Sequence, residues 1–457
     1  MVLTFKLSQI RAIIDCSTNV LSPASENLQI KNVCTDSRSV EAGDLFVALR
    51  GENFDGHDFV STALARGAIA AVVERPLDLP APWQGSQLLV KNTLLAYQNL
   101  ARAWRQHLNI PIIGITGSVG KTTTKEMIAA VLASFGRVHK TEANYNNEIG
   151  VPKTLLALTP EHDYGVVEMA MRGRGEIALL AQISQPNIGL ITNVGTAHIG
   201  RLGSEQAIAE AKCELLAEMP ADSVAILNYD SPRLLATARQ VWSGPTLTYG
   251  LTGGDWRGEL QSEQTLKIGE LTFPLPLPGR HQASNYLGAL ACAQVLGLDW
   301  QRFTQGLQVE LPGGRARRLV LSSDILLLDE TYNAGLESML AALQLLADTE
   351  GQRRIAVLGA MRELGERAEE FHQQVGKRVQ ELGIDYLFLL TNDSVAEAIA
   401  QGAKGVACQS FREPEDLVAS LEAFVQNGDR LLFKASNSIG LGKVVAALGN
   451  SKEFPDS

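Results

Sequence analysis

The sequence has few of the features that mark secreted, membrane-spanning or zinc-holding proteins. Only 5 of its 457 residues are cysteine. They are scattered singly, without a C-x-x-C pair, so neither a disulfide framework nor a zinc cage is indicated: Cys16, Cys34, Cys213, Cys292 and Cys408. No run of about 18 apolar residues occurs, and the N-terminal segment MVLTFKLSQIRAIID lacks the basic stretch and long apolar core of a signal peptide. We therefore expect a cytoplasmic protein with no membrane span.

Basic residues are too few for a general nucleic-acid-binding surface. Lys and Arg number 40 against 50 Asp and Glu, which gives a formal net charge of -10. Because binding to a phosphate backbone is normally driven by basic patches, we expect no nucleic-acid partner. Hydrophobic residues make up 45% and charged residues 20% of the chain, as in ordinary globular proteins. Its length suggests about three domains, at roughly 150 residues for each.

Three stretches of the chain differ in their pattern. Residues 1–108 alternate short β-rich segments such as DLFVAL with helical stretches, which predicts a small α/β domain. Residues 109–310 carry the strand candidates IIGIT, YGVVEMA and NIGLITNVG, and their alternation with helices predicts a mainly parallel sheet covered on both faces. A break at L-P-G-G-R opens residues 311–457, where RIAVLG, YLFLLT and RLLFKA predict another open α/β sheet.

The strongest functional signal is G-I-T-G-S-V-G-K-T-T, from Gly114 to Thr123, between a predicted strand and a predicted helix. Backbone N–H groups of such a loop cradle phosphates, while Lys121 can neutralise them and Thr122 can hold Mg²⁺. The strict spacing G-x-x-x-x-G-K-[ST] fails because Ile115 occupies the first glycine position, but the shorter G-x-x-G-K-T-T matches. A glycine-rich connection without function is the alternative. A lysine directly after glycine in this context favours phosphate binding, with ATP as the first expectation.

Three other residues are ambiguous without context. Glu168 follows the apolar strand YGVV, where a carboxylate at the carboxyl edge of a parallel sheet can bind Mg²⁺, but a solvated strand-end glutamate looks the same. His198 follows another strand candidate, and a lone histidine is more often a packed or surface residue. Lys212 lies in a helical pattern, where a solvated lysine is the ordinary interpretation.

The remaining candidates are polar residues for which a polar turn, a helix cap, an exposed arginine or a plain loop is the alternative: Asp36, Ser37, Arg38, Asn146, Asn147, Asn285, Arg315 and Asp329. The first three offer a carboxylate, a hydroxyl and a guanidinium in succession, which suits a uridine diphosphate. Arginine at a position such as Arg315 suits a multidentate phosphate contact.

A series of motifs in chain order resembles the Mur ligase family over nearly the whole chain. It comprises T-D-S-R-x-V-x-x-G-D-L-F-V-A-L-x-G, D-G-H, T-G-S-x-G-K-T-T-T-K-E-M, N-Y-N-N-E-I-G-V-P, G-E-I, T-N-V-G-x-A-H, L-P-G-R-H and D-E-T-Y-N-A. The phosphate-loop variant is similar to that of the members that add D-alanyl-D-alanine. The resemblance implies a three-domain architecture. A UDP-substrate-binding domain would span residues 1–108, a central ATP-binding domain with a P-loop ATPase-like parallel sheet residues 109–310, and a C-terminal Rossmann-like ligase domain residues 311–457.

The resemblance also implies a reaction. ATP and Mg²⁺ would support ligation of D-alanyl-D-alanine (D-Ala-D-Ala) to UDP-MurNAc-tripeptide through an acyl phosphate. The product would be the UDP-MurNAc-pentapeptide precursor, which places the chain in peptidoglycan synthesis, cell wall biogenesis, cell shape, cell division and the cell cycle. We expect a monomer.

Roles for individual residues follow from the same resemblance. It implies catalytic roles for Lys121, His198, Lys212 and Arg315. It implies nucleotide contacts from Gly117, Ser118, Val119, Gly120, Lys121, Thr122, Thr123, Asn285, Arg315 and Asp329. Magnesium would be held by Thr122, Glu168, His198 and Lys212, the last of them carbamylated. Substrate contacts would come from Asp36, Ser37, Arg38, Asn146 and Asn147.

Several positions depart from the family pattern. Ala170 and Ala360 stand where E-M-G and V-L-G-D-M have glycine and aspartate, Gly335 and Leu336 where asparagine and proline follow Y-N-A, and K-A-S-N (434–437) where K-G-S-R is usual. Most lie in the third domain, so they leave the accepted dipeptide open rather than the use of ATP. The third residue of the acceptor peptide is also open.

Three rival interpretations remain at this stage. Another Mur-type or folylpolyglutamate-type amide ligase would keep the phosphate loop and differ in product mass. A kinase or phosphatase with such a loop would transfer phosphate without forming an amide. A silent nucleotide-binding module would bind ATP without amine-dependent turnover.

Overall fold

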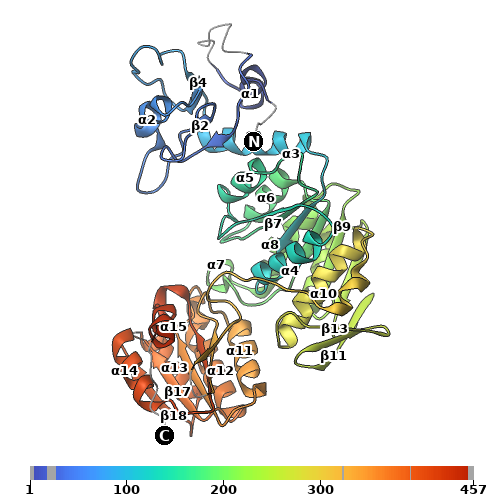
Figure 1. Ribbon diagram of the computed structural model, residues 1–457, viewed down its shortest axis with the longest axis vertical. Helices are drawn as coiled ribbons and strands as arrows, with labels where there is room; N and C mark the ends of the chain where they lie inside the picture. The colour runs from blue at the N-terminus through green and yellow to red at the C-terminus, as the bar shows by residue number, and fades with distance from the viewer. Residues whose placement is uncertain (1–4, 18–26, 322–323, 392, 451–457) are drawn as a thin grey trace.

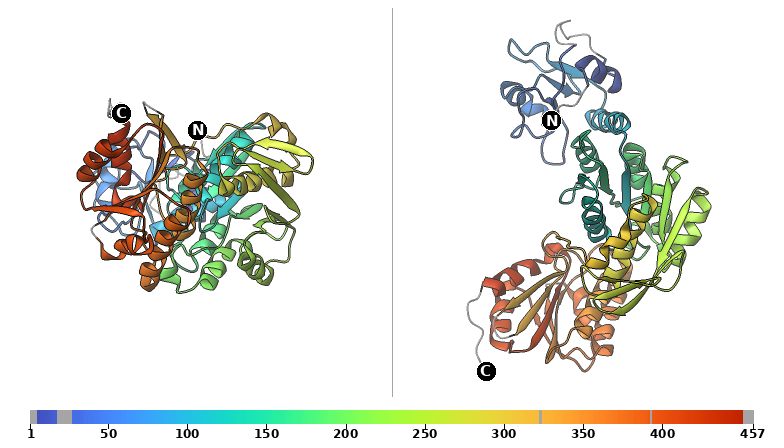
Figure 2. Two further views of the ribbon diagram at one scale, coloured as in Figure 1. Left: turned by 90° about the horizontal axis from the view of Figure 1, so that it is seen from below. Right: turned by 45° about the vertical axis from the view of Figure 1, so that its right-hand side comes forward.

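The computed structural model describes residues 5–17, 27–321, 324–391 and 393–450. Three α/β bodies follow one another along the chain, each built on its own sheet. The N-terminal and C-terminal bodies lie at opposite ends of the molecule, with the central body between them (Figures 1 and 2). The predicted α/β class is confirmed, since all three sheets are rich in parallel strands.

The N-terminal sheet has four parallel strands in the order β1-β2-β3-β4: Val33–Cys34, Leu45–Val47, Ala70–Val73 and Gln87–Leu89. Its helical segments are α1 Leu7–Ile13, η1 Gly56–Phe59, α2 Val60–Ala65 and α3 Thr93–His107. Helix α3 begins where the Asn92 side chain accepts a hydrogen bond from the Leu95 backbone, a standard N-cap. It packs against two helices of the central body, and the indole of Trp104 donates to the Leu158 carbonyl at 2.9 Å.

The central sheet has nine strands in the order β13-β12-β11-β10-β9-β8-β5-β7-β6. In chain order they are β5 Ile112–Thr116, β6 Val138–Lys140, β7 Tyr164–Glu168, β8 Ile188–Ile191, β9 Val224–Asn228, β10 Thr246–Gly250, β11 Trp256–Ser262, β12 Thr265–Ile268 and β13 Leu271–Pro274. Strands β6 to β11 run parallel, and the β11-β12-β13 edge is antiparallel. The middle strands are apolar and buried throughout, as expected for a sheet covered on both faces.

Helices of the central body are α4 Lys121–Ala133, α5 Gly150–Leu156, α6 Glu176–Ser184, α7 Ile199–Leu202, α8 Glu205–Ala217, α9 Pro232–Val241 and α10 Arg280–Val295, with the 3-10 segment η2 Trp300–Gln305. The neighbouring strands β8, β5 and β7 end at the same edge of the sheet, because they are parallel. The loops that follow them, together with the last residue of β7 and the first turn of α4, carry most of the predicted nucleotide and magnesium residues. Carboxyl edges of this kind are where open α/β sheets bind their ligands.

The C-terminal sheet has six strands in the order β14-β15-β19-β16-β17-β18. They are β14 Arg317–Leu321, antiparallel to the rest, β15 Ile325–Asp329, β16 Arg353–Gly359, β17 Tyr386–Leu390, β18 Ala407–Phe411 and β19 Asp429–Lys434. Helical segments are α11 Leu336–Asp348, η3 Gly365–Arg367, α12 Ala368–Glu381, α13 Ser394–Gly402, α14 Pro414–Phe424, η4 Asn437–Ile439 and α15 Leu441–Asn450. The parallel β15-β19-β16-β17-β18 portion is the Rossmann-like sheet that was expected.

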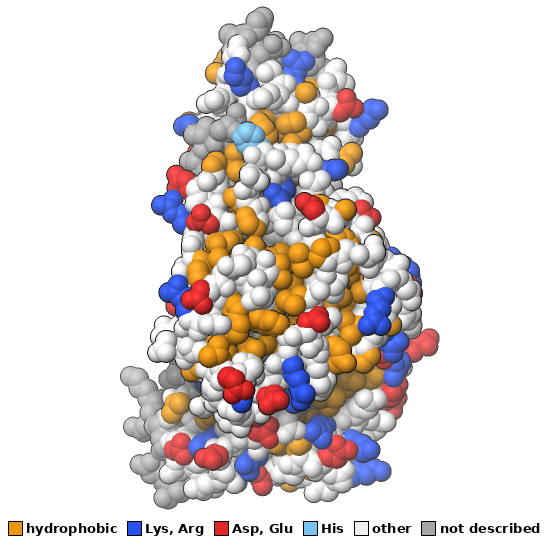
Figure 3. Space-filling model, turned by 90° about the vertical axis from the view of Figure 1, so that its right-hand side faces the viewer, with side chains coloured by type: hydrophobic (Ala, Val, Ile, Leu, Met, Phe, Trp, Pro, Cys, Tyr) orange, Lys and Arg blue, Asp and Glu red, His pale blue; other side chains and the backbone are white. Residues whose placement is uncertain are grey.

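The surface of the central body differs from that of the two ends. On the face shown in Figure 3, hydrophobic side chains gather over the middle of the molecule, and basic and acidic side chains are interspersed toward both ends. Across the described ranges, none of the helices is both long and apolar enough to cross a membrane.

Candidate functional site

The loop between β5 and α4 has the geometry of a phosphate cradle. Gly117 and Gly120 adopt φ of +152° and +85°, which side-chain-bearing residues rarely adopt. A Cβ on Gly117 would lie 1.9 Å from Thr192 Oγ1, and one on Gly120 would lie 2.6 Å from Asn285 Oδ1. Neighbouring groups therefore approach this loop so closely that glycine is needed at both positions.

Asn193, after β8, fixes this loop and was given no role in the sequence prediction. Its carbonyl accepts from the Ser118 backbone N–H at 3.1 Å, and its side-chain oxygen accepts from the Val119 N–H at 2.9 Å. Its Nδ2 donates to the Val119 carbonyl at 2.8 Å. The T-N-V-G-x-A-H motif contained the signal, but only the fold shows that its asparagine lies against the phosphate loop.

Lys121, the first residue of α4, folds back over the loop. Its Nζ donates to the carbonyls of Gly117 and Ser118 at 2.8 and 3.3 Å. Burial lowers the pKa of Lys121, Glu168 acts against that shift, and the Arg315 guanidinium adds to it. Two cations from different domains thus lie within electrostatic reach of each other, an arrangement that favours an anion between them.

Glu168, the last residue of β7, is buried beside the start of α4. Its two carboxylate oxygens accept from Thr122 Oγ1 at 3.1 and 2.9 Å, and one of them also accepts from Asn146 Nδ2 at 3.0 Å. Hydroxyl and carboxylate oxygens are the ligands that Mg²⁺ prefers. The donor set at the phosphate loop therefore fits the magnesium ion that the sequence predicted here, and the solvated-surface interpretation of Glu168 is wrong.

Asn285 lies in α10, which packs against α4. Its Nδ2 donates to Gln282 Oε1 at 3.0 Å, and its Oδ1 faces Gly120. The structure thus brings Asn285 to the phosphate loop from about 165 residues further along the chain, a distance over which sequence periodicity carries no information.

His198 is the N-cap residue of α7 and has the left-handed conformation, with φ of +66°. Its Nδ1 contacts Glu363 Oε2 of the C-terminal body at 2.6 Å. Burial, followed by the Lys121 charge, lowers its pKa. Glu363 was not among the sequence predictions, because nothing in the local pattern of M-R-E-L-G links it to a histidine 165 residues away.

Lys212 lies in α8 with only 2% of its surface exposed. Burial lowers its pKa well below the usual lysine range, and the Lys121 charge lowers it further. The solvated-helix interpretation of Lys212 is therefore wrong. A buried lysine without its proton is a nucleophilic amine.

The C-terminal body contributes Arg315 and Asp329. The Arg315 guanidinium stacks on the Tyr332 ring at 3.8 Å, and its Nε is buried without a hydrogen-bond acceptor among the described residues. Asp329, at the end of β15, accepts from the backbone N–H and hydroxyl of Thr331 at 3.1 and 2.7 Å. Beside it, Lys434 at the end of β19 is buried and donates to the Asn333 carbonyl at 3.0 Å.

The predicted substrate residues lie in two groups. In the N-terminal body Asp36 pairs with Arg38 at 2.7 Å, and that hydrogen bond lowers the pKa of Asp36 to about 2. Ser37 between them is buried. In the central body Asn146 contacts Glu168, and Asn147 Oδ1 accepts from the Gly150 backbone N–H at 2.9 Å, at the start of α5. Their roles as substrate contacts stay predictions.

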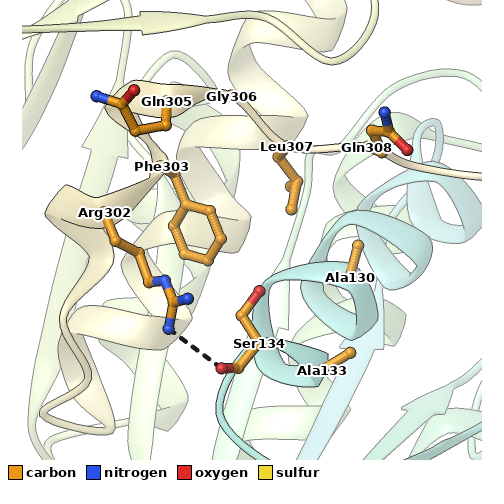
Figure 4. A pocket seen from close by; sticks show the side chains of 9 residues that line it. All are labelled: Ala130, Ala133, Ser134, Arg302, Phe303, Gln305, Gly306, Leu307 and Gln308. Carbon is orange, nitrogen blue, oxygen red and sulfur yellow. Dashed lines mark hydrogen bonds between the residues drawn. The ribbon is translucent and has the colours of Figure 1, made fainter.

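A cavity of about 590 Å³ lies elsewhere, at the C-terminal end of α4 (Figure 4). Arg302 borders it and donates to the Ser134 carbonyl at 3.2 Å. Its described lining residues do not include the predicted site residues. Because a helix C-terminus carries the negative end of the helix dipole, this end of α4 is unsuited to phosphate.

Comparison with known proteins decides the family. The models of the Mur ligase family catalytic domain, middle domain and glutamate ligase domain match residues 29–115, 115–293 and 314–437. A UDP-N-acetylmuramoyl-tripeptide--D-alanyl-D-alanine ligase from Synechocystis is 61% identical over 442 residues, which cover 97% of each chain. The chain belongs to the MurF branch of the Mur ligase family.

Solved structures of MurF agree with this assignment. MurF from Acinetobacter baumannii superposes with a TM-score of 0.86 at 30% identity, covering 98% of this chain and 100% of the other. MurF from Thermotoga maritima, solved in complex with ADP, gives a TM-score of 0.82 at 30% identity, covering 92% and 97%. The predicted family and the three-domain Mur ligase fold are confirmed.

Proposed function

We propose that this MurF-family chain ligates D-Ala-D-Ala to UDP-MurNAc-tripeptide at the expense of ATP, forming UDP-MurNAc-pentapeptide. The observation that carries the proposal is the 61% identity, over 97% of the chain, to a ligase named for that reaction. The phosphate loop, with Lys121 over it and Glu168 beside it, supports a reaction that begins on a nucleotide. The name of that relative supports an activity in peptidoglycan synthesis, and the proposed site of the reaction is the cytoplasm.

Nucleotide binding is assigned to the loop from Gly117 to Gly120 and to Lys121, Thr122 and Thr123, together with Asn285, Arg315 and Asp329. Backbone N–H groups and the α4 N-terminus favour the phosphates. Asn285 is included because its Oδ1 lies where a Cβ on Gly120 would meet it, next to the loop. Arg315 has an unused guanidinium nitrogen and reaches the loop electrostatically, which suits it to the transferred phosphoryl group.

Magnesium binding is assigned to Thr122, Glu168, His198 and Lys212. When bound, Mg²⁺ neutralises charge on phosphoryl oxygens. Thr122 and Glu168 already share a hydrogen bond and offer oxygen ligands. Lys212 fits as a carbamate, because its lowered pKa leaves a neutral amine that can add carbon dioxide and release a proton. The product is an anion with two oxygens.

In the proposed reaction the terminal carboxylate of UDP-MurNAc-tripeptide takes the γ-phosphoryl group of ATP, giving an acyl phosphate and ADP. The D-Ala-D-Ala amine then attacks the acyl carbon, and phosphate leaves. Lys121 and Arg315 offset charge on the phosphoryl oxygens through both steps. No side chain becomes a covalent nucleophile, so positioning supplies most of the rate. Asp36, Ser37, Arg38, Asn146 and Asn147 are the proposed contacts to the nucleotide-linked acceptor.

The test uses the purified chain with ATP, Mg²⁺, UDP-MurNAc-tripeptides that differ in their third residue, and a panel of dipeptides. We expect one equivalent of ADP and phosphate for each UDP-MurNAc-pentapeptide, identified by mass. ADP release without a condensed product, or condensation that prefers a single amino acid over D-Ala-D-Ala, would overturn the proposal.

A further inference from the structure

A buried lysine lies behind the proposed magnesium site, in a part of the molecule that the proposed reaction does not use. Lys125 is in α4, three residues after Thr122, so both side chains leave the helix on the same face. The Lys125 side chain is 1% exposed. An ammonium ion is costly to bury unless its protons are all paired.

Three oxygen atoms surround the Lys125 ammonium, one of them as a hydrogen-bond acceptor and two as carboxylate partners in ion pairs. Nζ donates to the Thr141 carbonyl at 2.7 Å and lies 3.0 Å from Glu126 Oε1 and 3.7 Å from Glu168 Oε2. Thr141 also reaches Glu168 directly, because its Oγ1 accepts from the Glu168 backbone N–H at 3.0 Å. The Lys125 ammonium and Thr141 thus hold both the side chain and the backbone of Glu168.

The need to neutralise Glu126 does not explain why Lys125 is buried. Glu126 has a second cationic partner, Lys140, whose Nζ contacts Glu126 Oε2 at the protein surface. Lys140 is 41% exposed, so it can satisfy Glu126 without being buried. Glu168 is 3% exposed, and Lys125 is the cation that contacts it among the described residues.

We propose that Lys125 is a positioning residue for the nucleotide-bound magnesium site, which it serves by fixing the carboxylate of Glu168. One Glu168 oxygen is held by Asn146 and the other faces Lys125, while Thr122 bonds to both. Contacts from several sides set the plane of the carboxylate. Groups that orient a metal ligand in this way typically change metal affinity by about 10-fold to 100-fold when they are removed. The inference rests on the proposed magnesium role of Glu168.

The experiment compares Lys125→Met, the double variant Lys125→Met/Glu126→Gln and the control Lys140→Met. The double variant replaces a buried ion pair with neutral side chains of similar size, a change that folded proteins commonly tolerate. It leaves Glu168 without its ammonium. Calorimetry measures ADP affinity in Mg²⁺ and in EDTA, and thermal melting reports stability.

We expect the gain in ADP affinity that Mg²⁺ confers to fall by about 10-fold or more in both Lys125 variants. ADP affinity in EDTA should change by less than about twofold, and Lys140→Met should behave as the unaltered protein in both conditions. Glu126→Gln in the double variant should recover thermal stability but not the Mg²⁺-dependent affinity. A double variant with full Mg²⁺-dependent affinity would reduce Lys125 to a structural partner of Glu126 and overturn the inference.

The variant Glu168→Gln distinguishes an error in the proposed magnesium site from an error in the positioning role of Lys125. If this variant keeps the full Mg²⁺-dependent gain, the proposed magnesium site itself is wrong. If Glu168→Gln loses the gain while the Lys125 variants keep it, the site stands and the positioning role of Lys125 is wrong.

Discussion

Glu337 of the C-terminal body accepts a hydrogen bond from the backbone N–H of Thr196 in the central body, at 2.6 Å. The same carboxylate accepts from the Thr196 hydroxyl at 3.2 Å. Glu363 forms a second link, with His198 at 2.6 Å and Arg201 at 3.2 Å. Two carboxylates of the C-terminal body therefore contact the segment of the central body that carries His198, a proposed magnesium residue.

These links predict a measurable restraint on domain movement. The contacts of Glu337 and Glu363 tether the C-terminal body to the central one, so a closure that moves one body relative to the other would break them. We expect small-angle scattering to show compaction when ATP and UDP-MurNAc-tripeptide are both saturating. Glu337→Ala/Glu363→Ala should reach half of that compaction at a ligand concentration about fivefold lower, because the competing contacts are gone.

The exposed Glu366, in η3 beside Glu363, supplies the matched control. Glu366→Ala should need the same ligand concentration as the unaltered protein. An unchanged radius at saturating ligand, in a preparation with full turnover, would count against closure in solution.

Gly120 offers a test of crowding at the phosphate loop. Gly120→Ala and Gly405→Ala both force alanine to φ of +85°, so each should lose roughly 1 kcal/mol of stability. A Cβ on Gly120 meets Asn285 Oδ1 at 2.6 Å, whereas no described atom lies within 4 Å of one on Gly405. We expect ADP affinity to fall by about tenfold or more in Gly120→Ala alone. Equal ADP affinity in the two variants, measured by calorimetry, would show that the loop tolerates the shift.

Lys121→Ala removes the cation that lies over the phosphate loop. We expect ligation to fall by about 100-fold or more, because charge on the transferred phosphoryl group loses its nearest neutralising side chain. Burial lowers the pKa of this lysine, so its removal should not cost stability, and thermal melting checks that the fold is intact. Normal product formation in a folded Lys121→Ala protein would reject the assignment.

The features that could be predicted from sequence are local ones. Strand β5, the loop after it and α4 follow from a buried apolar run, two glycines and a lysine within one short segment. The place of Glu168 is predictable for a similar reason, because the end of an apolar strand in a parallel sheet lies at the ligand-binding edge.

Contacts between distant segments could not be predicted in this way. Asn193 lies 74 residues from Val119, and Glu337 lies 141 residues from Thr196. Pattern and propensity act over a few turns of chain, so they do not indicate which polar side chains meet across domains. Lys125 is a further example, because a lysine in the polar first half of α4, K-T-T-T-K-E, gives no sign of being buried between two carboxylates.

Two departures from the family pattern lie side by side. The backbone N–H of Ser436 donates to the Ala360 carbonyl at 3.0 Å, so Ala360 lies next to the K-A-S-N segment that ends at Asn437. An acidic residue and a basic residue of the family pattern are thus both absent from one place. Near it Arg362 pairs with Asp393 at 2.9 Å. Because one negative and one positive charge are lost together, the net charge of this part of the C-terminal body stays the same.

His372 predicts a pH dependence of stability. The ring is fully buried, the Met361 N–H donates to its Nε2 at 2.9 Å, and its Nδ1 donates to the Ala368 carbonyl at 2.6 Å. Burial lowers its pKa from the usual 6.5; Asp393 opposes this shift and Arg362 adds to it. The unfolded chain therefore binds a proton before the folded one does, and stability is lost as pH falls below 6.5.

His372→Gln should weaken this dependence, because glutamine can still donate and accept but does not titrate. Denaturant unfolding between pH 7.5 and pH 5, a range of about one to two units on either side of the histidine value, provides the measurement. Equal loss of stability in both proteins across this range would show that His372 is not the group responsible.

Lys212 allows the sharpest test of the magnesium assignment, because its unmodified and modified forms carry opposite charges. An ammonium at this buried position would repel Mg²⁺, whereas a carbamate would supply oxygen ligands. Burial lowers the pKa of Lys212 well below the usual range, so the amine is ready to take up carbon dioxide. Lys212→Ala should therefore lower turnover by about 100-fold or more. A short carboxylic acid in the medium should partly restore turnover by filling the vacated space. It should restore nothing in Lys121→Ala, which lacks a cation instead.

Carbamylation of Lys212 also predicts a dependence on carbon dioxide. Removing dissolved carbon dioxide should lower turnover of the unaltered protein, and added bicarbonate should reverse this loss. A high-resolution structure with Mg²⁺ and nucleotide should show density for a carboxyl group beyond Nζ, and a bare ammonium in an active preparation would exclude carbamylation.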